Sequence, residues 1–236
     1  MFRFSHCAAL AAITVLGASA AADTVDLTFT GHTGLNTISL NGGTAFNGNH
    51  AAGHLSHSID SGPRTGQSFN TFCIELAEFA NGGSSTYEIV DLADAPRSNT
   101  PDDQSDNYGQ TKADGVVGVI SKAIDLGWID INLQATPGSL NAENNADRMS
   151  AIQAAIWAVL FDSTATSGDA DVASALMALN DQSLNTSTFD LMQGRLRAVV
   201  ADGEQDQLIV VPLPPAALAG LGMLGLCAGV RAARRR

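Results

Sequence analysis

Cysteine is scarce in this chain of 236 residues. Three cysteines are present, and Cys7 and Cys227 lie near the two ends, so Cys73 is alone in the long central part. A single thiol cannot close a disulfide within that part, even in an oxidising compartment. An unpaired exported thiol indicates an intermolecular bridge or a reactive group, and a buried inert cysteine is the alternative.

Basic residues are also few, and they are unevenly distributed. Five of the 12 arginines and lysines lie before residue 23 or after residue 207, whereas all 24 acidic residues lie between these positions. Residues 23–207 therefore carry a formal charge of −17. So acidic a surface disfavours nucleic acid and anionic lipid as partners. Cations, basic proteins and neutral polysaccharide stay compatible with it, and solubility outside the cell is its plainest explanation.

Several motifs that carry enzyme or metal chemistry are missing. The sequence has no glycine-rich phosphate loop, no G-x-S-x-G elbow and no HExxH pair. His50, His54 and His57 have a spacing that would gather imidazoles on a helix, but the segment contains Gly53, and we interpret it as a solvated loop. The acidic run 102–107 lacks the frame and the distal glutamate of a calcium loop. We therefore expect no metal, no cofactor and no enzymatic turnover.

The N-terminus has the order of a secretory signal peptide. Arg3 precedes an apolar run over residues 7–16, and small residues follow over 17–22. This succession of basic, apolar and small residues predicts a signal peptide over residues 1–22, which is removed on export.

The C-terminal segment, residues 208–236, has three features in succession. A proline-containing stretch precedes an uncharged apolar run over 213–230, and the chain ends in a block of arginines. A run of this length is about the shortest that spans hydrocarbon. Basic residues next to a span stay on the cytoplasmic side. The sequence thus predicts a transmembrane helix with a cytoplasmic tail, whose basic residues are Arg231, Arg234, Arg235 and Arg236.

This tail resembles the PEP-CTERM class of sorting signals in its VPLPA variant. The motif residues are Val211, Pro212, Leu213 and Pro214, followed by Pro215 where the variant has alanine. The resemblance implies recognition by an exosortase, a membrane-embedded cysteine peptidase of Gram-negative envelopes that cuts near the motif. It also implies an inner-membrane anchor before processing and a cell-surface or extracellular place afterwards, with the exosortase and the secretion machinery as partners.

Residues 23–207 are predicted to form an α+β ectodomain in which strands precede helices. Short apolar alternations in the first third indicate strands of an antiparallel sheet, and spacings of three and four residues after residue 111 indicate helices. We expect strands at about 25–29, 37–40, 69–79 and 87–92, with a turn at 81–83 between the last two. We expect helices at about 111–128, 142–161, 171–180 and 188–201, the second following Asn141 as a cap.

The second expected helix is apolar nearly all round, which predicts a central and buried position. Gln153 lies on one stripe of this helix with Met149, Ile156, Trp157 and Leu160. A buried amide without partners costs about 1–3 kcal/mol. Gln153 therefore needs a hydrogen-bonding or covalent partner.

Two short motifs resemble those of the thioester domains of bacterial surface proteins. Phe72-Cys73 matches the aromatic-Cys motif of an early strand, and Ile152-Gln153-Ala154-Ala155-Ile156-Trp157 matches the apolar-Gln-x-x-apolar-Trp motif of a later helix. The resemblance implies an internal thioester between Cys73 and Gln153, formed with loss of ammonia. An amine or hydroxyl on a surface protein or polysaccharide would then capture Gln153 and free Cys73, which is single-use adhesion without turnover.

The residues alone leave a second interpretation open. Cys73 would then be an inert core residue, and Gln153 would hydrogen-bond to backbone where the helix meets the sheet. The protein would be a noncovalent structural component of the extracellular matrix with the same fold. If the reaction does occur, Glu75, on the same strand face as Cys73, is the nearest candidate for a general base.

Overall fold

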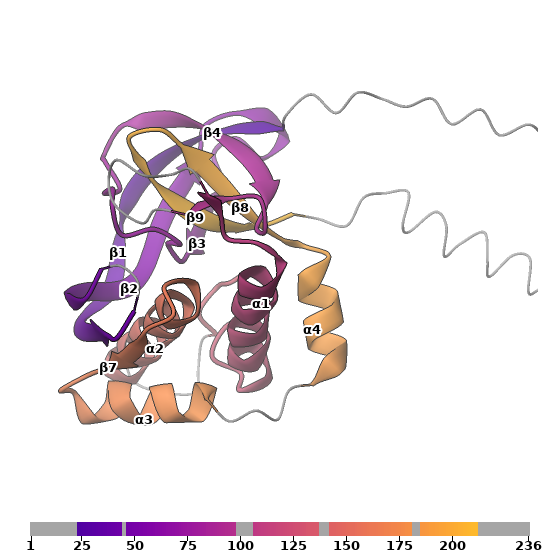
Figure 1. Cartoon of the computed structure of the whole chain (residues 1–236). Helices are drawn as coiled ribbons and strands as arrows, with labels where there is room; N and C mark the ends of the chain where they lie inside the picture. Colours follow the sequence, from indigo (N-terminus) through magenta and orange to yellow (C-terminus); the bar gives the residue numbers. More distant parts are fainter. Residues whose placement is uncertain (1–22, 44–45, 98–105, 137–141, 181–184, 212–236) are drawn as a thin grey trace, which may run out of the picture.

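The computed structural model describes residues 23–43, 46–97, 106–136, 142–180 and 185–211 (Figure 1). They form an α+β fold with a curled antiparallel sheet and four α-helices. The sheet strands are β1 (Thr24–Asn41), β2 (Gly48–Ile59), β3 (Ser68–Thr71), β4 (Ser84–Asp91), β7 (Thr164–Thr166), β8 (Leu196–Ala201) and β9 (Glu204–Val210). The helices are α1 (Gln110–Asp125), α2 (Ala142–Leu160), α3 (Ala170–Leu179) and α4 (Thr186–Gln193), with a 3-10 turn at Gly62–Arg64.

The main sheet has the strand order β3-β2-β1-β4-β8-β9, and β7 pairs with β1. A separate two-stranded ladder joins β5 (Pro96–Arg97) to β6 (Asp106–Asn107). The chain just after β3 returns to the far edge strand, because the Leu208 N–H donates to the Phe72 carbonyl at 2.9 Å and the Ile74 N–H donates to the Asp206 carbonyl at 3.0 Å. These bonds close the curled sheet on itself at residues 72–74.

The first half of the sheet is a long hairpin. The strands expected at 25–29 and 37–40 are two parts of the single strand β1, which pairs along most of its length with β2. The prediction of a solvated loop around His50, His54 and His57 is wrong, because all three residues belong to β2. His54 and His57 are buried, and their rings stack on Phe72 and Phe69 at centroid distances of 4.6 and 5.6 Å.

The strand expected at 69–79 is only partly present. Regular pairing ends at Thr71, Cys73 forms an isolated bridge with Gln207, and bends follow over residues 76–78. The expected hairpin across 81–83 does not form, since β3 pairs with β2 while β4 pairs with β1 and β8. Pairing of residues 72–74 with the last strand of the domain replaces it.

The C-terminal end of the domain differs most from expectation. The helix expected at 188–201 is present only in its first half, as the short α4, which ends at Gln193. The second half is a strand, because β8 begins at Leu196. β8 pairs with β4 on one side and with β9 on the other, which establishes it as a strand. β8 and β9 complete the sheet after the helices, so strands do not simply precede helices. β9 also continues to Val210, past the expected end of the domain at 207.

The helices expected at 111–128, 142–161 and 171–180 are confirmed as α1, α2 and α3, although α1 ends at Asp125. α2 packs against β1, β2, α1 and α3, and it lies below the sheet in Figure 1. Its residues 149–157 are all buried, as the sequence predicted for a central helix. This position brings the side chains of α2 to the inner side of the curled sheet.

The predicted signal peptide over 1–22 lies outside the residues that the structure describes, as do residues 212–236 of the predicted C-terminal segment and the expected cap Asn141. The motif residues Pro212, Leu213 and Pro214 are among them. Val211 directly follows β9, and its N–H donates to the Arg195 carbonyl at 3.0 Å. Within the described part of the chain, no helix is long and apolar enough to span a bilayer.

α2 approaches β1 so closely that a side chain at Gly34 would collide with it. Gly34 has a φ of 59°, and a Cβ placed there would lie 2.3 Å from the Cβ of Ala146 and 2.5 Å from its Cα. Gly42 has a similar φ of 75° with no heavy atom within 4 Å of such a Cβ. Glycine at position 34 thus permits both the left-handed turn and the close helix contact.

We therefore expect Gly34→Ala to destabilise the fold more than Gly42→Ala. Both changes place alanine in a left-handed conformation, but only the first forces α2 away from β1. The difference in free energy of unfolding should be about 1–3 kcal/mol, the usual cost of overpacking. Urea unfolding followed by circular dichroism measures it, and equal losses in the two variants would show that α2 does not contact β1 at this point.

Candidate functional site

Cys73 and Gln153 lie side by side although 80 residues separate them in the chain. The backbone N–H of Cys73 donates to Gln153 Oε1 at 2.8 Å, and Gln153 Nε2 donates to the Cys73 carbonyl at 2.8 Å. Both residues are buried, with exposed fractions of 2% and 1%. The structure thus brings together the two residues that the motifs singled out.

The closure of the sheet explains why a glutamine is needed here. Phe72 and Ile74 direct their backbone groups to β9, so the N–H and C=O of Cys73 point the other way, toward α2. Buried backbone groups must find partners. The Gln153 amide supplies one acceptor and one donor, and so it takes the place of a neighbouring strand. We refer to these two hydrogen bonds as the amide clamp.

The Cys73 thiol is protonated at neutral pH. Its Sγ donates to the backbone carbonyl of Glu75 at 3.0 Å. The pKa of the Cys73 thiol is raised to about 12, mainly by burial and to a smaller extent by the negative charges of Glu75 and Asp206. The hydrogen bond to the Glu75 carbonyl and an interaction with the Trp157 side chain partly oppose the rise. The thiolate, which is the reactive form of cysteine, is therefore strongly disfavoured in this environment.

A cavity of about 580 Å³ reaches both residues of the clamp. Cys73, Gln153 and Trp157 line it together with mostly apolar side chains, including Phe79, whose exposed fraction is 78%. The other lining residues are Phe29, His32, Leu35, Asn49, His50, Ala51, Gly53, Leu55, Leu76, Glu78, Ala80 and Gln205. A small nucleophile in this cavity would meet the clamp without unfolding of the domain.

Glu75, the general base suggested by the sequence, is buried beside a second acid. Its Oε2 accepts a hydrogen bond from the Asp206 backbone N–H at 3.3 Å, and the exposed fractions of the two residues are 1% and 3%. The pKa of Asp206 is raised to about 8, mainly by burial and to a smaller extent by the negative charge of Glu75. Sequence reasoning missed Asp206 because β9 was not predicted. Asp206 shares one strand face with Leu208 and Val210, and this spacing indicates a strand but not its burial on both faces.

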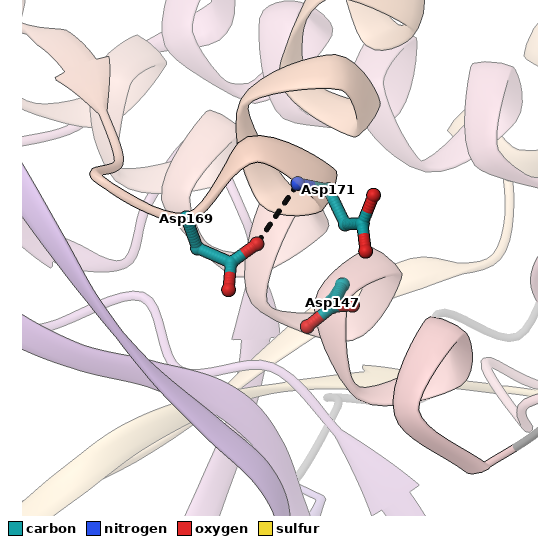
Figure 2. A group of neighbouring side chains, drawn as sticks. All are labelled: Asp147, Asp169 and Asp171. Carbon is teal, nitrogen blue, oxygen red and sulfur yellow. Dashed lines mark hydrogen bonds between the residues drawn. The ribbon is translucent and has the colours of Figure 1, made fainter.

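A separate acidic cluster lies near the N-terminal end of α3 (Figure 2). Carboxylate oxygens of Asp147, Asp169 and Asp171 lie within 4.8 Å of one another, and such oxygens are ligands for calcium. Two of these carboxylates already accept protein hydrogen bonds. Asp169 Oδ1 caps α3 by accepting from the Asp171 N–H at 2.9 Å, and Asp147 Oδ1 accepts from Asn36 at 2.8 Å. In the described residues no histidine joins a group of this kind.

Comparisons of this chain with protein-family models, with curated proteins and with solved structures found no match.

The amide clamp predicts a large loss of stability when Gln153 is removed. In a Cys73→Ala background, which cannot form a thioester, Gln153→Ala leaves two buried backbone groups without partners and opens a cavity. We expect a decrease in free energy of unfolding of about 2–4 kcal/mol. Exposed Gln193, changed to alanine in the same background, should alter it by less than about 0.5 kcal/mol. Similar small losses for both variants, measured by urea unfolding, would contradict the clamp.

The pKa of Asp206 predicts a pH dependence of stability. Its folded value of about 8 lies above the ordinary value of 3.8, so the folded state binds more protons between these pH values. The protonated Asp206 carboxyl therefore contributes its full stabilisation of the folded state below about pH 4. This contribution to the free energy of unfolding decreases by a few kcal/mol as the pH rises to about 8. Buried His54 and His57, whose pKa values are lowered to about 4, act in the opposite direction below pH 6.5.

Asp206→Asn isolates the contribution of this carboxyl, because the amide oxygen still accepts from the Ala201 N–H and the histidines are unchanged. The stability of the wild type relative to Asp206→Asn should fall as the pH rises from about 4 to about 8. Thermal or urea unfolding across this range measures the difference. A difference that does not change with pH would show that Asp206 titrates as an ordinary exposed acid.

Proposed function

We propose that this protein is an exported envelope protein that attaches to another surface or matrix component through a thioester between Cys73 and Gln153. The observation that carries the proposal is the amide clamp. It holds the side-chain amide of Gln153 against the backbone of the residue that bears the lone thiol of the described chain. Bond formation between groups held in this way has the entropic advantage of an intramolecular reaction.

The clamp also supports the chemistry of the first step. Cys73 Sγ attacks the side-chain carbonyl carbon of Gln153, a carbon–sulfur bond forms, and the carbon–nitrogen bond breaks. The thiol proton goes to the leaving nitrogen, which departs as ammonia. Negative charge develops on Oε1 during the attack, and the Cys73 N–H at 2.8 Å is placed to stabilise it.

In the second step, a primary amine or a hydroxyl in the cavity attacks the same carbon. An amide or ester forms, the carbon–sulfur bond breaks, and the proton of the nucleophile ends on Cys73. The thiol is regenerated but the glutaminyl group is consumed, so each molecule reacts once.

The proposed location rests on the two ends of the chain. The signal peptide at 1–22 would direct export, and the helix after Val211 with its arginine tail would hold the protein in the inner membrane. An exosortase would then sort the domain to the cell surface or the extracellular matrix. The partner for capture is an amine or hydroxyl on a protein or polysaccharide there.

The amide clamp also favours a second candidate function. Gln153 satisfies both backbone groups of Cys73 by hydrogen bonds alone, so the fold is complete without a covalent bond. In that case the protein is a noncovalent structural component of the matrix.

Intact mass distinguishes the two functions. The purified ectodomain should be lighter than its sequence by one ammonia and should gain one methylamine on incubation, because the amine captures the acyl group. Cys73→Ala is the matched control, and it should show the full sequence mass before and after methylamine. A wild type with the full mass and one titratable thiol would overturn the covalent function and leave the noncovalent one.

A further inference from the structure

The cavity that reaches the amide clamp has mostly apolar walls and a carboxylate in its lining. Its large apolar side chains are Phe29, Leu35, Leu55, Leu76, Phe79 and Trp157. Among the described residues that line it, Glu78 is the one acid, and there is no lysine or arginine. Sugar hydroxyls need hydrogen-bonding partners when they leave water, and mostly apolar walls supply few of them. A nucleophile with an aliphatic stem and a positive charge matches this lining better.

Glu78 lies beside the turn between β8 and β9, which carries two more acids. Its Oε1 accepts a hydrogen bond from the N–H of Gly203, which lies between Asp202 and Glu204 in the chain, at 3.2 Å. The pKa of Glu78 is raised, mainly by burial and to a smaller extent by the charges of Asp202 and Glu204, while the hydrogen bond from Gly203 opposes the rise. A cation bound beside Glu78 offsets the repulsion between these acids. Charge complementarity thus favours an ammonium group at this side of the cavity.

The chain itself offers few amines that could react. Apart from the α-amino group, lysines are the primary amines of a protein, and the 236 residues include two of them, Lys112 and Lys122. Lys112 Nζ donates to the Val159 carbonyl at 2.7 Å and forms an ion pair with Asp162. Lys122 is buried, with an exposed fraction of 7%. Neither lysine can enter the cavity of a second copy without leaving its place in the fold.

Hydroxyl groups, by contrast, are exposed close to the cavity. Thr30, Thr33 and Thr37 are exposed on β1, the strand that also contributes Phe29 and Leu35 to the cavity lining. A thioester open to hydroxyls would meet these groups on every copy of the protein. A thioester that takes amines is spared this reaction, because both lysines are held within the fold. The contrast favours an amine of another protein as the nucleophile.

We infer that the cavity takes the side chain of a lysine from another protein, with its aliphatic stem against the apolar walls and its ammonium group beside Glu78. This inference rests on the proposed function, and it narrows the captured partner to a lysine-bearing protein that is not a second copy of this chain. The formal charge of −17 over residues 23–207 attracts a basic partner and repels a second copy.

Capture of the lysine balances without another reactant. The ammonium group releases one proton to water, and the neutral Nζ attacks the side-chain carbonyl carbon of Gln153. A carbon–nitrogen bond forms, the carbon–sulfur bond breaks, and one of the two protons on the nitrogen ends on Cys73 Sγ. The products are an isopeptide bond between two proteins and a free thiol. Glu78 is a positioning residue in this reaction, since it acts on the ammonium group before the attack.

Three small probes separate the contributions of the stem and of the nucleophile. n-Butylamine has the stem and amine of a lysine side chain, methylamine lacks most of the stem, and n-butanol replaces the amine by a hydroxyl. Capture by the purified protein is followed by intact mass at one pH, where the two amines ionise alike. We expect n-butylamine to react at least about tenfold faster than methylamine, because each fully buried methylene favours binding about fourfold. n-Butanol should give no ester.

Glu78→Gln tests the carboxylate, because the amide oxygen can still accept from the Gly203 N–H. This change should slow capture of n-butylamine about threefold at low salt, and the difference should disappear at high salt. Glu88→Gln is the matched control, since it changes an exposed acid of β4 outside the cavity lining, and it should leave the rate unchanged. The wild-type rate should itself decrease with salt, so the test does not depend on the variant alone.

Denaturing electrophoresis of concentrated wild type should show no covalent dimers. Such dimers, an ester with n-butanol, or equal rates with n-butylamine and methylamine would overturn the inference and leave the thioester intact. Equal rates in Glu78→Gln and Glu88→Gln, with a wild-type rate that does not change with salt, would overturn it as well. A wild type that keeps its full sequence mass and gains no amine would overturn both the inference and the proposed function.

Discussion

The amide clamp between Gln153 and Cys73 is the contact on which the rest of the structure depends. The curled sheet closes where residues 72–74 pair with β9. The N–H and C=O of Cys73 point away from β9, toward α2, where no strand lies to accept and donate their hydrogen bonds. Gln153 fills that position from the centre of a buried helix. One polar side chain thus joins the helical layer to the closure of the sheet, and its removal affects both.

The same contact accounts for the chemical properties of the site. A carbonyl held by a backbone N–H is already polarised in the direction that attack by sulfur requires. Burial, which stabilises the clamp, makes the thiol unreactive by raising its pKa. The structure therefore combines an activated carbonyl with a suppressed nucleophile.

Much of the helical layer could be predicted from the sequence, because α1 has apolar residues at helical spacing and α2 is a long segment that is apolar nearly all round. Cys73 and Gln153 could be found as well, one because it is a lone cysteine and the other because a buried amide needs a partner. The sheet was harder to predict. β8 and β9 are short and follow helices, and their strand identity depends on pairing with β4 and with residues 72–74. Asp206 was missed with them, since no local pattern shows that a strand is buried by distant partners.

The most direct test of the covalent account is peptic digestion of the purified protein at low pH, followed by mass spectrometry of the peptides. If the thioester exists, the peptide that contains Cys73 should be joined to the one that contains Gln153, with a combined mass reduced by one ammonia. Separate peptides with a free thiol on Cys73 and an intact amide on Gln153 would contradict the account, and they would leave the clamp as a purely structural contact.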